Sequence, residues 1–397
     1  MFPGIRRPWP ASEAWHGECS PSRIVAARGH PPGRESLVAA SFLRADGDTL
    51  AARRFRELVE EAGGPGAIER PGMPEDLLRR LAARLEPDGQ TRASRCRAAL
   101  EWARRALEEG EHRQLECLTV GAQAYPDRLW QIPDPPVTLW LRGRSALLGE
   151  AAVAIVGARQ ATPAGLAVAT RVARELAEAG LVVVSGMARG IDGAAHQGAL
   201  DAGGPTVAVL GCGADVVYPG EHEALARCIG ESGALVSEFP PGSAPLPWRF
   251  PLRNRIISGL VHAVVVIEAS EHSGSLITAK AALEQGRDVL AVPGSVASGR
   301  YRGSHALIKD GARLVETVDD VLDEIGWQRA PVAGPSEQHK NNEISWLERL
   351  MVAGEDYHLD ELVELSRRRA GDVLAELAEL EISGRVARRP GGNFAKA

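Results

Sequence analysis

A repeated alternation of short apolar segments with longer amphipathic ones, over residues 151 to about 325, constrains the fold of this chain more than any other feature. Four of the apolar segments cover residues 153–156, 182–185, 206–210 and 263–268. Each is too short for an ordinary helix, and helical periodicity fills the stretches between them. Short, almost continuously apolar strands separated by helices indicate a parallel sheet covered on both faces. We therefore predict an α/β fold with a doubly wound parallel sheet.

The part of the chain before this sheet has a helical pattern. Apolar residues recur at helical spacing between 36 and 112, with a break at Gly63-Gly64-Pro65-Gly66. Residues 1–35 are rich in Pro, Gly, Arg and Ser and show no periodicity. These patterns predict a flexible N-terminal tail at 1–35 and a small helical domain at 36–112, with the α/β domain at 113–325.

The last part of the chain has a third pattern. Residues 326–341 are polar and contain Pro331, Gly334 and Pro335, a composition typical of a linker. Helical segments follow at 343–352, 359–365 and 370–382, and residues 385–397 can form a hairpin around Pro390-Gly391-Gly392. Three short helices and a hairpin predict a winged-helix domain at 342–397.

The overall composition excludes several classes of protein. Of the 397 residues, 25% are charged and 44% are hydrophobic, which is the balance of a soluble globular protein and excludes a wholly disordered chain. Lys and Arg number 46 against 52 Asp and Glu, and the net charge of −6 gives no sign of a nucleic-acid partner. No signal peptide and no run of 18 apolar residues is readable, so we expect no membrane contact.

The five cysteines lie far apart, at positions 19, 96, 117, 212 and 228. They form no C-x-x-C pair, and no histidine cluster accompanies them. We therefore expect no zinc site, no other metal site and no disulfide framework. A reducing cytoplasm is the expected location.

The first candidate site follows the first predicted strand. Gly157 ends that strand, Arg159 comes two residues later, and Gly165 lies at the start of the next helix. A glycine here lets backbone amides approach a phosphate, and the helix N-terminus adds a positive dipole end. The segment matches neither G-x-G-x-x-G nor a P-loop. The alternative interpretation is a tight turn with an exposed arginine.

The second candidate site follows the next strand and has four residues that suit an open, basic strand end: Ser185, Gly186, Arg189 and Gly190. Asp192 can cap the following helix, with His196 one turn later on the same face. An Asp/His pair invites a catalytic interpretation, but no nucleophile elbow and no third metal ligand accompany it. A structural role that caps and orients is favoured over a general base.

Two further segments carry polar groups where elements begin. Arg253, Asn254 and Arg255 directly precede an apolar segment, so an anion or a carboxylate must satisfy them, and Glu238 or Glu268 could do so in a buried ion pair. Where a later strand ends and a helix begins, four residues can form another anion site: Ser273, Gly274, Ser275 and Thr278.

These candidate segments fall at or near the carboxyl ends of strands, where open α/β sheets bind ligands. Arg159, Arg189, Arg253 and Arg255 are expected to converge on one small pocket. Several phosphate-compatible positions along one edge suit a polyphosphate or a nucleic-acid backbone better than one small molecule. The sequence offers no convincing reaction apparatus, so we predict a binding protein without catalytic residues and without a cofactor.

The ordered motifs resemble those of the DNA-processing protein A family, also called DprA or Smf. The resemblance is dense between about 115 and 325, and the flanking segments fit the three-part layout of that family. It rests on these strings: Tyr125-Pro126-Asp127-Arg128-Leu129, Ala154-Ile155-Val156-Gly157-Ala158-Arg159, Ser185-Gly186-Met187-Ala188-Arg189-Gly190-Ile191-Asp192, Gly211-Cys212-Gly213, Arg253-Asn254-Arg255, Ser273-Gly274-Ser275 and Pro293-Gly294.

The resemblance implies a Rossmann-like domain, with a SAM-like helical domain before it and a winged helix after it. It also implies a dimer that binds single-stranded DNA and helps to load RecA recombinase onto it during natural transformation. Arg159 would then grip a phosphate and Arg253 and Arg255 would support it, with Ser273, Gly274 and Ser275 lining the pocket. The alternative is a nucleotide-processing enzyme, such as a phosphoribohydrolase, that uses Asp192 or Glu268 as acid or base.

Charge separates the roles of the domains. Residues 151–325 contain 14 Lys and Arg against 19 Asp and Glu, so DNA must bind in a local basic pocket and affinity should fall only modestly with salt. Residues 341–397 contain 8 against 11. That balance favours a protein contact for the winged helix over duplex DNA, although Arg367-Arg368-Arg369 argues the other way.

Overall fold

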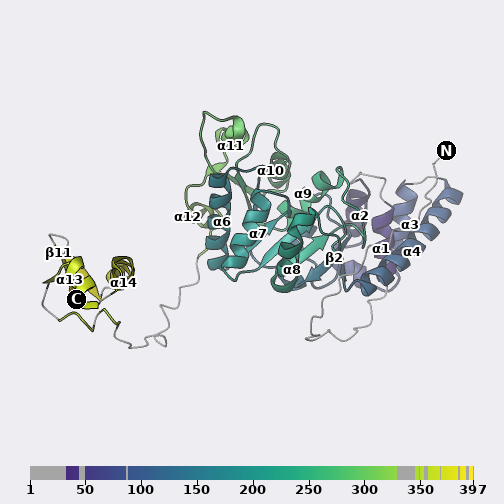
Figure 1. The fold of residues 1–397 in the computed structure, drawn as a ribbon. Helices are drawn as coiled ribbons and strands as arrows, with labels where there is room; N and C mark the ends of the chain where they lie inside the picture. Colours follow the sequence, from purple (N-terminus) through teal and green to yellow (C-terminus); the bar gives the residue numbers. More distant parts are fainter. Residues whose placement is uncertain are drawn as a thin grey trace. The chain divides into compact units, whose positions relative to one another are not determined.

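The computed structural model describes residues 33–43, 50–85, 88–328, 345–347, 349–352, 356–366, 368–382, 385–389 and 393–396. The chain divides into two compact units, one up to Gln328 and one from Arg329 onward (Figure 1). Most of the predicted tail and the predicted linker lie outside the described residues, as does Arg367. No helix among those described is long and apolar enough to cross a membrane.

A nine-stranded sheet forms the centre of the first unit, in the order β1-β2-β6-β5-β4-β3-β7-β8-β9. The parallel strands are β3 (Ala152–Gly157), β4 (Val182–Ser185), β5 (Thr206–Leu210), β6 (Ala234–Ser237), β7 (Ala263–Ile267), β8 (Asp288–Ala291) and β9 (Arg313–Leu314). Within the parallel part of the sheet, the chain passes from β3 outward through β4 and β5 to β6, and then crosses to the other side of β3 with β7. The predicted doubly wound α/β fold is therefore confirmed.

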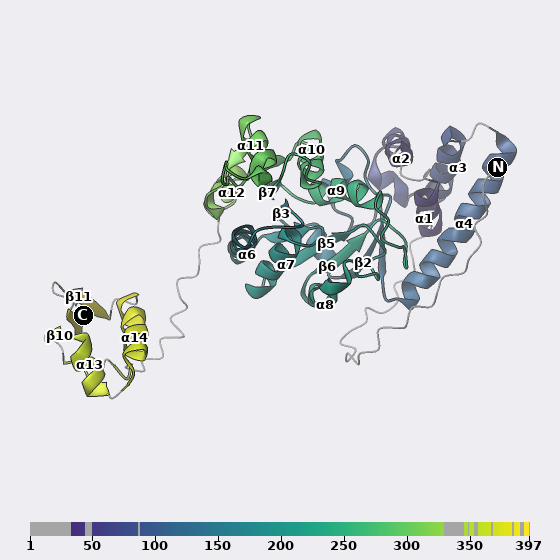
Figure 2. The ribbon, with the colours of Figure 1, turned by 45° about the horizontal axis from the view of Figure 1, so that its top comes forward.

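Helices cover both faces of this sheet. Figure 2 shows α6 (Pro163–Glu178), α7 (Ile191–Asp201) and α8 (Glu223–Ser232) on one face, and α9 (Arg249–Gly259), α10 (Ser275–Glu284) and α11 (Arg302–Lys309) on the other. Alternate side chains of β3 enter different cores, because successive strand residues point to opposite faces. Val153 and Ile155 belong to the core under α6 and α7, whereas Ala154 and Val156 belong to the core under α9 and α10. α12 (Val318–Glu324) completes the first of these cores.

Two antiparallel strands and a helical layer extend this unit. β2 (Thr138–Gly143) pairs with β6, and β1 (Glu116–Thr119) pairs with β2. The predicted helical segment contains α1 (Arg34–Phe42), α2 (Leu50–Glu61), α3 (Met73–Leu85) and α4 (Gly89–His112). These helices share one buried core with the sheet: Gly110 of α4 lies so close to Trp140 that a Cβ there would stand 2.5 Å from the indole ring. Shorter helical segments are η1 (Pro65–Glu69), α5 (Asp127–Trp130), η2 (Ser145–Leu148), η3 (Gly220–His222) and η4 (Gly299–Tyr301).

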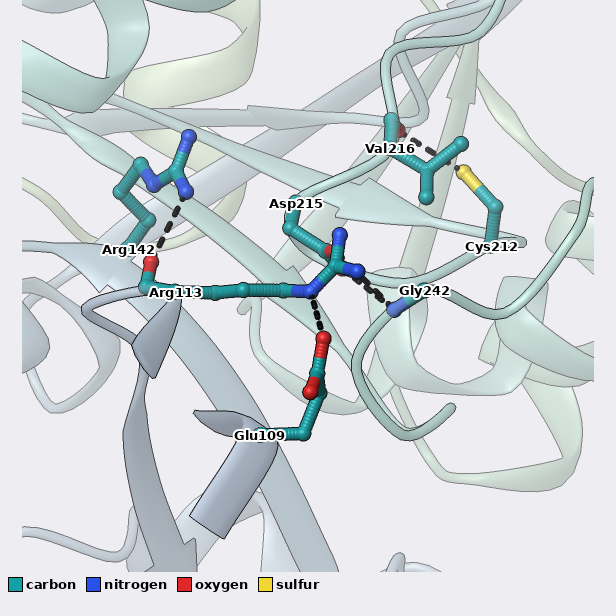
Figure 3. A network of polar contacts seen from close by, with 7 residues as sticks. All are labelled: Glu109, Arg113, Arg142, Cys212, Asp215, Val216 and Gly242. Carbon is teal, nitrogen blue, oxygen red and sulfur yellow. Dashed lines mark hydrogen bonds and ion pairs between the residues drawn. The ribbon is translucent and has the colours of Figure 1, made fainter. Parts of the chain in front are cut away.

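Polar contacts also join the end of α4 to the sheet (Figure 3). Nη1 of Arg113 lies 2.6 Å from a carboxylate oxygen of Asp215, and Arg142 of β2 donates to the backbone carbonyl of Arg113 at 3.0 Å. The same carboxylate accepts from the backbone N–H of Gly242 at 2.8 Å. These contacts hold together the loop after β5 and the segment that leads to α9.

The second unit contains α13 (Leu359–Ser366), α14 (Ala370–Ile382) and a sheet of order β10-β12-β11. Its strands are β10 (Asp356–Tyr357), β11 (Val386–Arg389) and β12 (Asn393–Lys396), around a core that includes Leu362, Leu377 and Phe394. The predicted hairpin is confirmed. The helix predicted at 343–352 is wrong for its described part, since residues 345–347 and 349–352 form turns and irregular backbone.

Candidate functional site

A pocket of about 570 Å³ opens at the point where the strand order reverses, between the carboxyl ends of β3 and β7. Open α/β sheets bind ligands at this position because the loops diverge there. The pocket brings together nine of the predicted site residues: Gly157, Arg159, Asp192, Arg253, Asn254, Ser273, Gly274, Ser275 and Thr278. Phe250, Glu268 and Arg300 also line it.

Two glycines let the loop after β3 lie close to its neighbours. A Cβ on Gly157 would stand 2.0 Å from the carbonyl oxygen of Ile267, and one on Gly190 would stand 2.2 Å from that of Ala158. Gly190 also has φ 74°, which disfavours other residues. The backbone N–H of Ile191 donates to Ala158 at 3.1 Å, so the loop that carries Arg159 is held on both sides.

Arg159 is exposed at the rim of the pocket. Its guanidinium lies 5.7 Å from the centre of the Phe250 ring, a cation–π distance. Among the described residues it forms no ion pair with a carboxylate. The charge of Arg159 is thus oriented by an aromatic face and remains available to an anion.

Arg253 also lines the pocket but is buried, unlike Arg159. Its Nη1 donates to the carbonyl oxygen of Val209 at 2.8 Å, while its Nε has no hydrogen-bond partner in the described structure. Burial lowers the pKa of Arg253 to about 10, against the opposing effect of the Asp192 carboxylate. A Cβ on Gly186 would overlap the guanidinium, so Gly186 makes room for Arg253 and does not itself line the pocket.

Asp192 orients the loop after β4. Its carboxylate accepts from the backbone N–H groups of Gly186 at 3.1 Å and Ala188 at 3.3 Å. Burial raises its pKa, and the charge of Arg253 and these hydrogen bonds oppose that shift. The expected cap is corrected, because the residue at the N-cap of α7 is Gly190 and Asp192 lies within the first turn.

His196 and Ser185 are fully buried and do not line the pocket. Nδ1 of His196 lies 2.7 Å from Oγ1 of Thr206, and Oγ1 in turn donates to the carbonyl oxygen of Val183 at 2.6 Å. Burial lowers the pKa of His196 to about 3. Ser185 donates to the carbonyl oxygen of Ile155 at 2.6 Å. His196 thus joins α7 to β5, and Ser185 joins β4 to β3.

The start of α10 forms the opposite wall of the pocket. Gly274 is the N-cap residue, and the hydroxyls of Ser273 and Ser275 lie 2.8 Å apart. Ser275 and Thr278 are buried within the first turn. Two hydroxyls at the positive end of a helix give this wall the character of an anion site.

Glu268 places a carboxylate in this otherwise anion-binding pocket. It is fully buried at the end of β7, with φ 55°, and one oxygen accepts from the backbone N–H and the hydroxyl of Thr162 at 2.9 and 3.1 Å. The other oxygen lies 3.6 Å from Arg300. A Cβ on Gly165 would stand 2.1 Å from this carboxylate, so Gly165 makes room for Glu268 and does not line the pocket.

The predicted convergence of four arginines is wrong for two of them. Arg255 is buried against Glu238 and Asp134, with nitrogen–oxygen distances of 2.7 and 3.3 Å, so it forms the structural ion pair that the sequence left open. Burial alone would lower the pKa of Arg255, but these two carboxylates raise it. Arg189 is exposed and pairs with Glu221 at 2.7 Å. Moreover, Arg253 and Arg255 lie in the middle of α9, not at the start of an element.

Sequence reasoning missed Phe250 as a site residue. Its position beside Arg159 depends on how α9 packs near the end of β5, where Phe250 also lies close to Gly211, and no local sequence pattern predicts that packing. The only signal was an aromatic residue next to the Arg253-Asn254-Arg255 motif. Arg300 of η4 also lines the pocket.

Comparison with known proteins identifies relatives of both units. Residues 116–326 match the family model of DNA recombination-mediator protein A, and residues 353–392 match the DprA winged-helix domain. The chain is 45% identical to the DNA processing protein DprA of Streptococcus pneumoniae over 214 residues, which cover 54% of this chain and 76% of that one. It is 37% identical to Protein Smf of Escherichia coli over 294 residues, 72% of this chain and 78% of that one.

A solved structure agrees with these matches. The X-ray structure of DNA processing protein A from Streptococcus pneumoniae aligns with a TM-score of 0.60 and 36% identity, over 73% of this chain and 94% of that one. The expected Rossmann-like domain and winged helix are therefore confirmed. With its strand order, its pocket at the switch point and its matching motifs, this chain belongs to the DprA/Smf family of DNA recombination-mediator proteins.

Proposed function

We propose that this chain binds single-stranded DNA, with a backbone phosphate held between Arg159 and the start of α10. One observation carries this proposal: the same pocket contains Arg159, which is exposed and forms no ion pair among the described residues, and the N-terminus of α10 with the hydroxyls of Ser273 and Ser275. Charge-assisted hydrogen bonds from arginine and from such helix ends are the usual means of holding phosphate. The Phe250 ring beside Arg159 offers a face on which a base can stack.

The small size of this basic site favours one strand over a duplex. The α/β domain carries a net charge of −5 between residues 151 and 325, so most of its surface repels DNA. A pocket of about 570 Å³ can take one phosphate and its nucleotide, whereas duplex binding normally uses a broad basic face.

The family description supports a role in recombination. The matching family model is described as DNA recombination-mediator protein A, and curated relatives bear the name DNA processing protein. We propose that this chain acts as a cytoplasmic homodimer that loads RecA onto the strand during natural transformation, without catalysing a reaction and without a cofactor. Its acidic winged helix would contact protein.

The test compares Arg159→Ala with Arg171→Ala, which removes another exposed arginine, on α6. Binding of a labelled oligo-dT would be followed by fluorescence anisotropy. Loss of a charge-assisted phosphate contact should weaken the Arg159→Ala complex roughly 10- to 100-fold, while the control binds as the unmodified protein does. Unchanged affinity of Arg159→Ala would remove the pocket from the proposal.

A nucleotide-processing enzyme is the second candidate, because two carboxylates, Asp192 and Glu268, line the pocket. One oxygen of each already accepts hydrogen bonds from the protein, which suits a structural role. Incubation with nucleoside monophosphates distinguishes the candidates. Release of a free base that disappears in Glu268→Gln would establish the enzyme.

A further inference from the structure

A second aromatic cluster lies next to the pocket, where the chain enters α9. Trp248 directly precedes the helix and is 41% exposed, although it is the largest apolar side chain of this segment. Its ring meets that of Phe239 edge-to-face, with centroids 6.3 Å apart. Phe239 is buried, so it anchors the exposed indole to the body of the domain.

An arginine completes this cluster. The guanidinium of Arg249 lies 4.6 Å from the Phe239 ring centre and 5.1 Å from that of Trp248. Its Nη1 donates to the carbonyl oxygen of Ala244 at 2.8 Å. These contacts restrict the rotamers of Trp248, so a flat ligand that stacks on it loses little additional side-chain entropy on the protein side.

The cluster is continuous with the pocket. Phe250, two residues after Trp248, lies under Arg159 and packs against the exposed Tyr218 ring, with centroids 5.4 Å apart. Two residues span at most about 7 Å of backbone. A stacked strand rises about 3.4 Å per nucleotide, so this span corresponds to one or two nucleotides.

The chemistry of the cluster selects nucleobases as its ligand. Aromatic rings and arginine planes are the surfaces on which unpaired bases stack, whatever their sequence. A cation held over the rings also suits a polyanion, and it would disfavour a purely apolar protein partner.

We propose that Trp248, held by Phe239 and Arg249, is a stacking site for a base of the same strand whose phosphate occupies the pocket. This inference rests on the proposed function, since it needs a single strand at the pocket. The strand would run from the Arg159–Phe250 rim along the start of α9, and its bases would rest on Phe250 and then on Trp248.

The test uses Trp248→Ala and Trp248→Phe, with Trp102→Ala as the control. Trp102 lies on α4, is 46% exposed and also contacts an aromatic ring, that of Phe42. Loss of one base–aromatic stack should weaken binding of oligo-dT about tenfold in Trp248→Ala. Trp248→Phe should retain most of the affinity, and Trp102→Ala should retain all of it.

An oligonucleotide that lacks bases separates stacking from other effects. Trp248→Ala and the unmodified protein should bind an abasic strand of the same length equally, because no base is there to stack. If circular dichroism shows that Trp248→Ala does not fold, a second measurement replaces it. Oligo-dT that stacks on Trp248 should quench indole fluorescence, so the quenching should be smaller in Trp248→Phe than in the unmodified protein and unchanged in Trp102→Phe.

The outcomes keep the two proposals apart. Weak binding by Arg159→Ala together with full binding by Trp248→Ala would overturn the stacking site and leave the phosphate pocket standing. Full binding by both variants would overturn the proposed function itself. A change of oligomeric state in Trp248→Ala without a change in DNA affinity would assign the cluster to a protein interface and overturn the stacking site.

Discussion

Arg159 and Arg253 show that the surroundings of an arginine decide whether it can bind an anion. Arg159 is exposed against Phe250 and can meet a ligand, whereas Arg253 is buried, with one nitrogen on the carbonyl of Val209 and a pKa lowered to about 10. Arg255, two positions further along the same helix, is neutralised by Glu238 and Asp134. Of these three side chains, only Arg159 can exchange its contacts with water for a phosphate at a small cost in desolvation free energy.

The hydrogen bonds around His196 define its protonation state. Since the hydroxyl proton of Thr206 is donated to Val183, Nδ1–H of His196 is the donor to Thr206. Nε2 has no hydrogen-bond partner among the described residues, so a second proton there would be buried and unsatisfied. Burial is the main cause that lowers its pKa to about 3, and the charge of Arg253 acts in the same direction.

We therefore expect stability to fall in mild acid. The folded pKa lies below the unfolded value of 6.5, so the unfolded chain binds a proton first and the contribution is lost as the pH falls from 6.5 toward 3. At pH 5 the loss due to His196 is about 2 kcal/mol. Urea unfolding at pH 7.5 and pH 5 checks this: His196→Asn, which keeps a donor but cannot titrate, should lose about that much less. Equal losses in both proteins would contradict it.

At the element scale, small residues decide how closely helices and loops approach the strand ends. Gly165 in α6 leaves space for the Glu268 carboxylate, and Gly186 leaves space for the Arg253 guanidinium. Sequence patterns marked both glycines as part of the site, on the ground that they open the backbone to a ligand. The structure gives them another task, which is to admit buried charged side chains from other elements.

Gly165→Ala should therefore destabilise the protein, although alanine in a helix normally adds about 0.5–1 kcal/mol of stability. The new methyl group would stand 2.1 Å from a Glu268 oxygen that also holds Thr162, the N-cap residue of α6. Overpacking of this kind costs about 1–3 kcal/mol. Chemical denaturation measures it, with Gly89→Ala at the start of α4 as the control, because nothing lies within 4 Å of a Cβ there. A stabilised Gly165→Ala would refute the contact.

At the scale of the whole molecule, a net charge of −6 coexists with a basic pocket. The pocket contains Arg159, Arg253 and Arg300 together with the carboxylates of Asp192 and Glu268, and Arg300 lies 3.6 Å from Glu268. Arg189 and Arg255 are paired with carboxylates elsewhere. The overall charge thus describes the average surface and does not describe the site.

This arrangement predicts a shallow salt dependence of DNA binding. With one or two phosphates neutralised, the logarithm of the binding constant for a single strand should fall with the logarithm of salt concentration at a slope of roughly −0.7 to −1.4. Anisotropy titrations between about 50 and 300 mM salt measure this slope. Arg159→Ala should reduce the magnitude of the slope by about 0.7. A slope several times steeper would indicate a broad basic surface that this pocket does not supply.

The sequence by itself determined the elements and the class of fold, because apolar periodicity depends on neighbours a few positions apart. Strands β3, β4, β5 and β7, and the helices between them, follow from that pattern. Only the tertiary structure decided which polar residues meet, since partners such as Arg255 and Asp134, or Arg159 and Phe250, are about 90 to 120 positions apart. Burial and pairing arise between elements, so the division of the arginines into one that faces the rim and others that stabilise the fold could be read only once the sheet had brought their partners together.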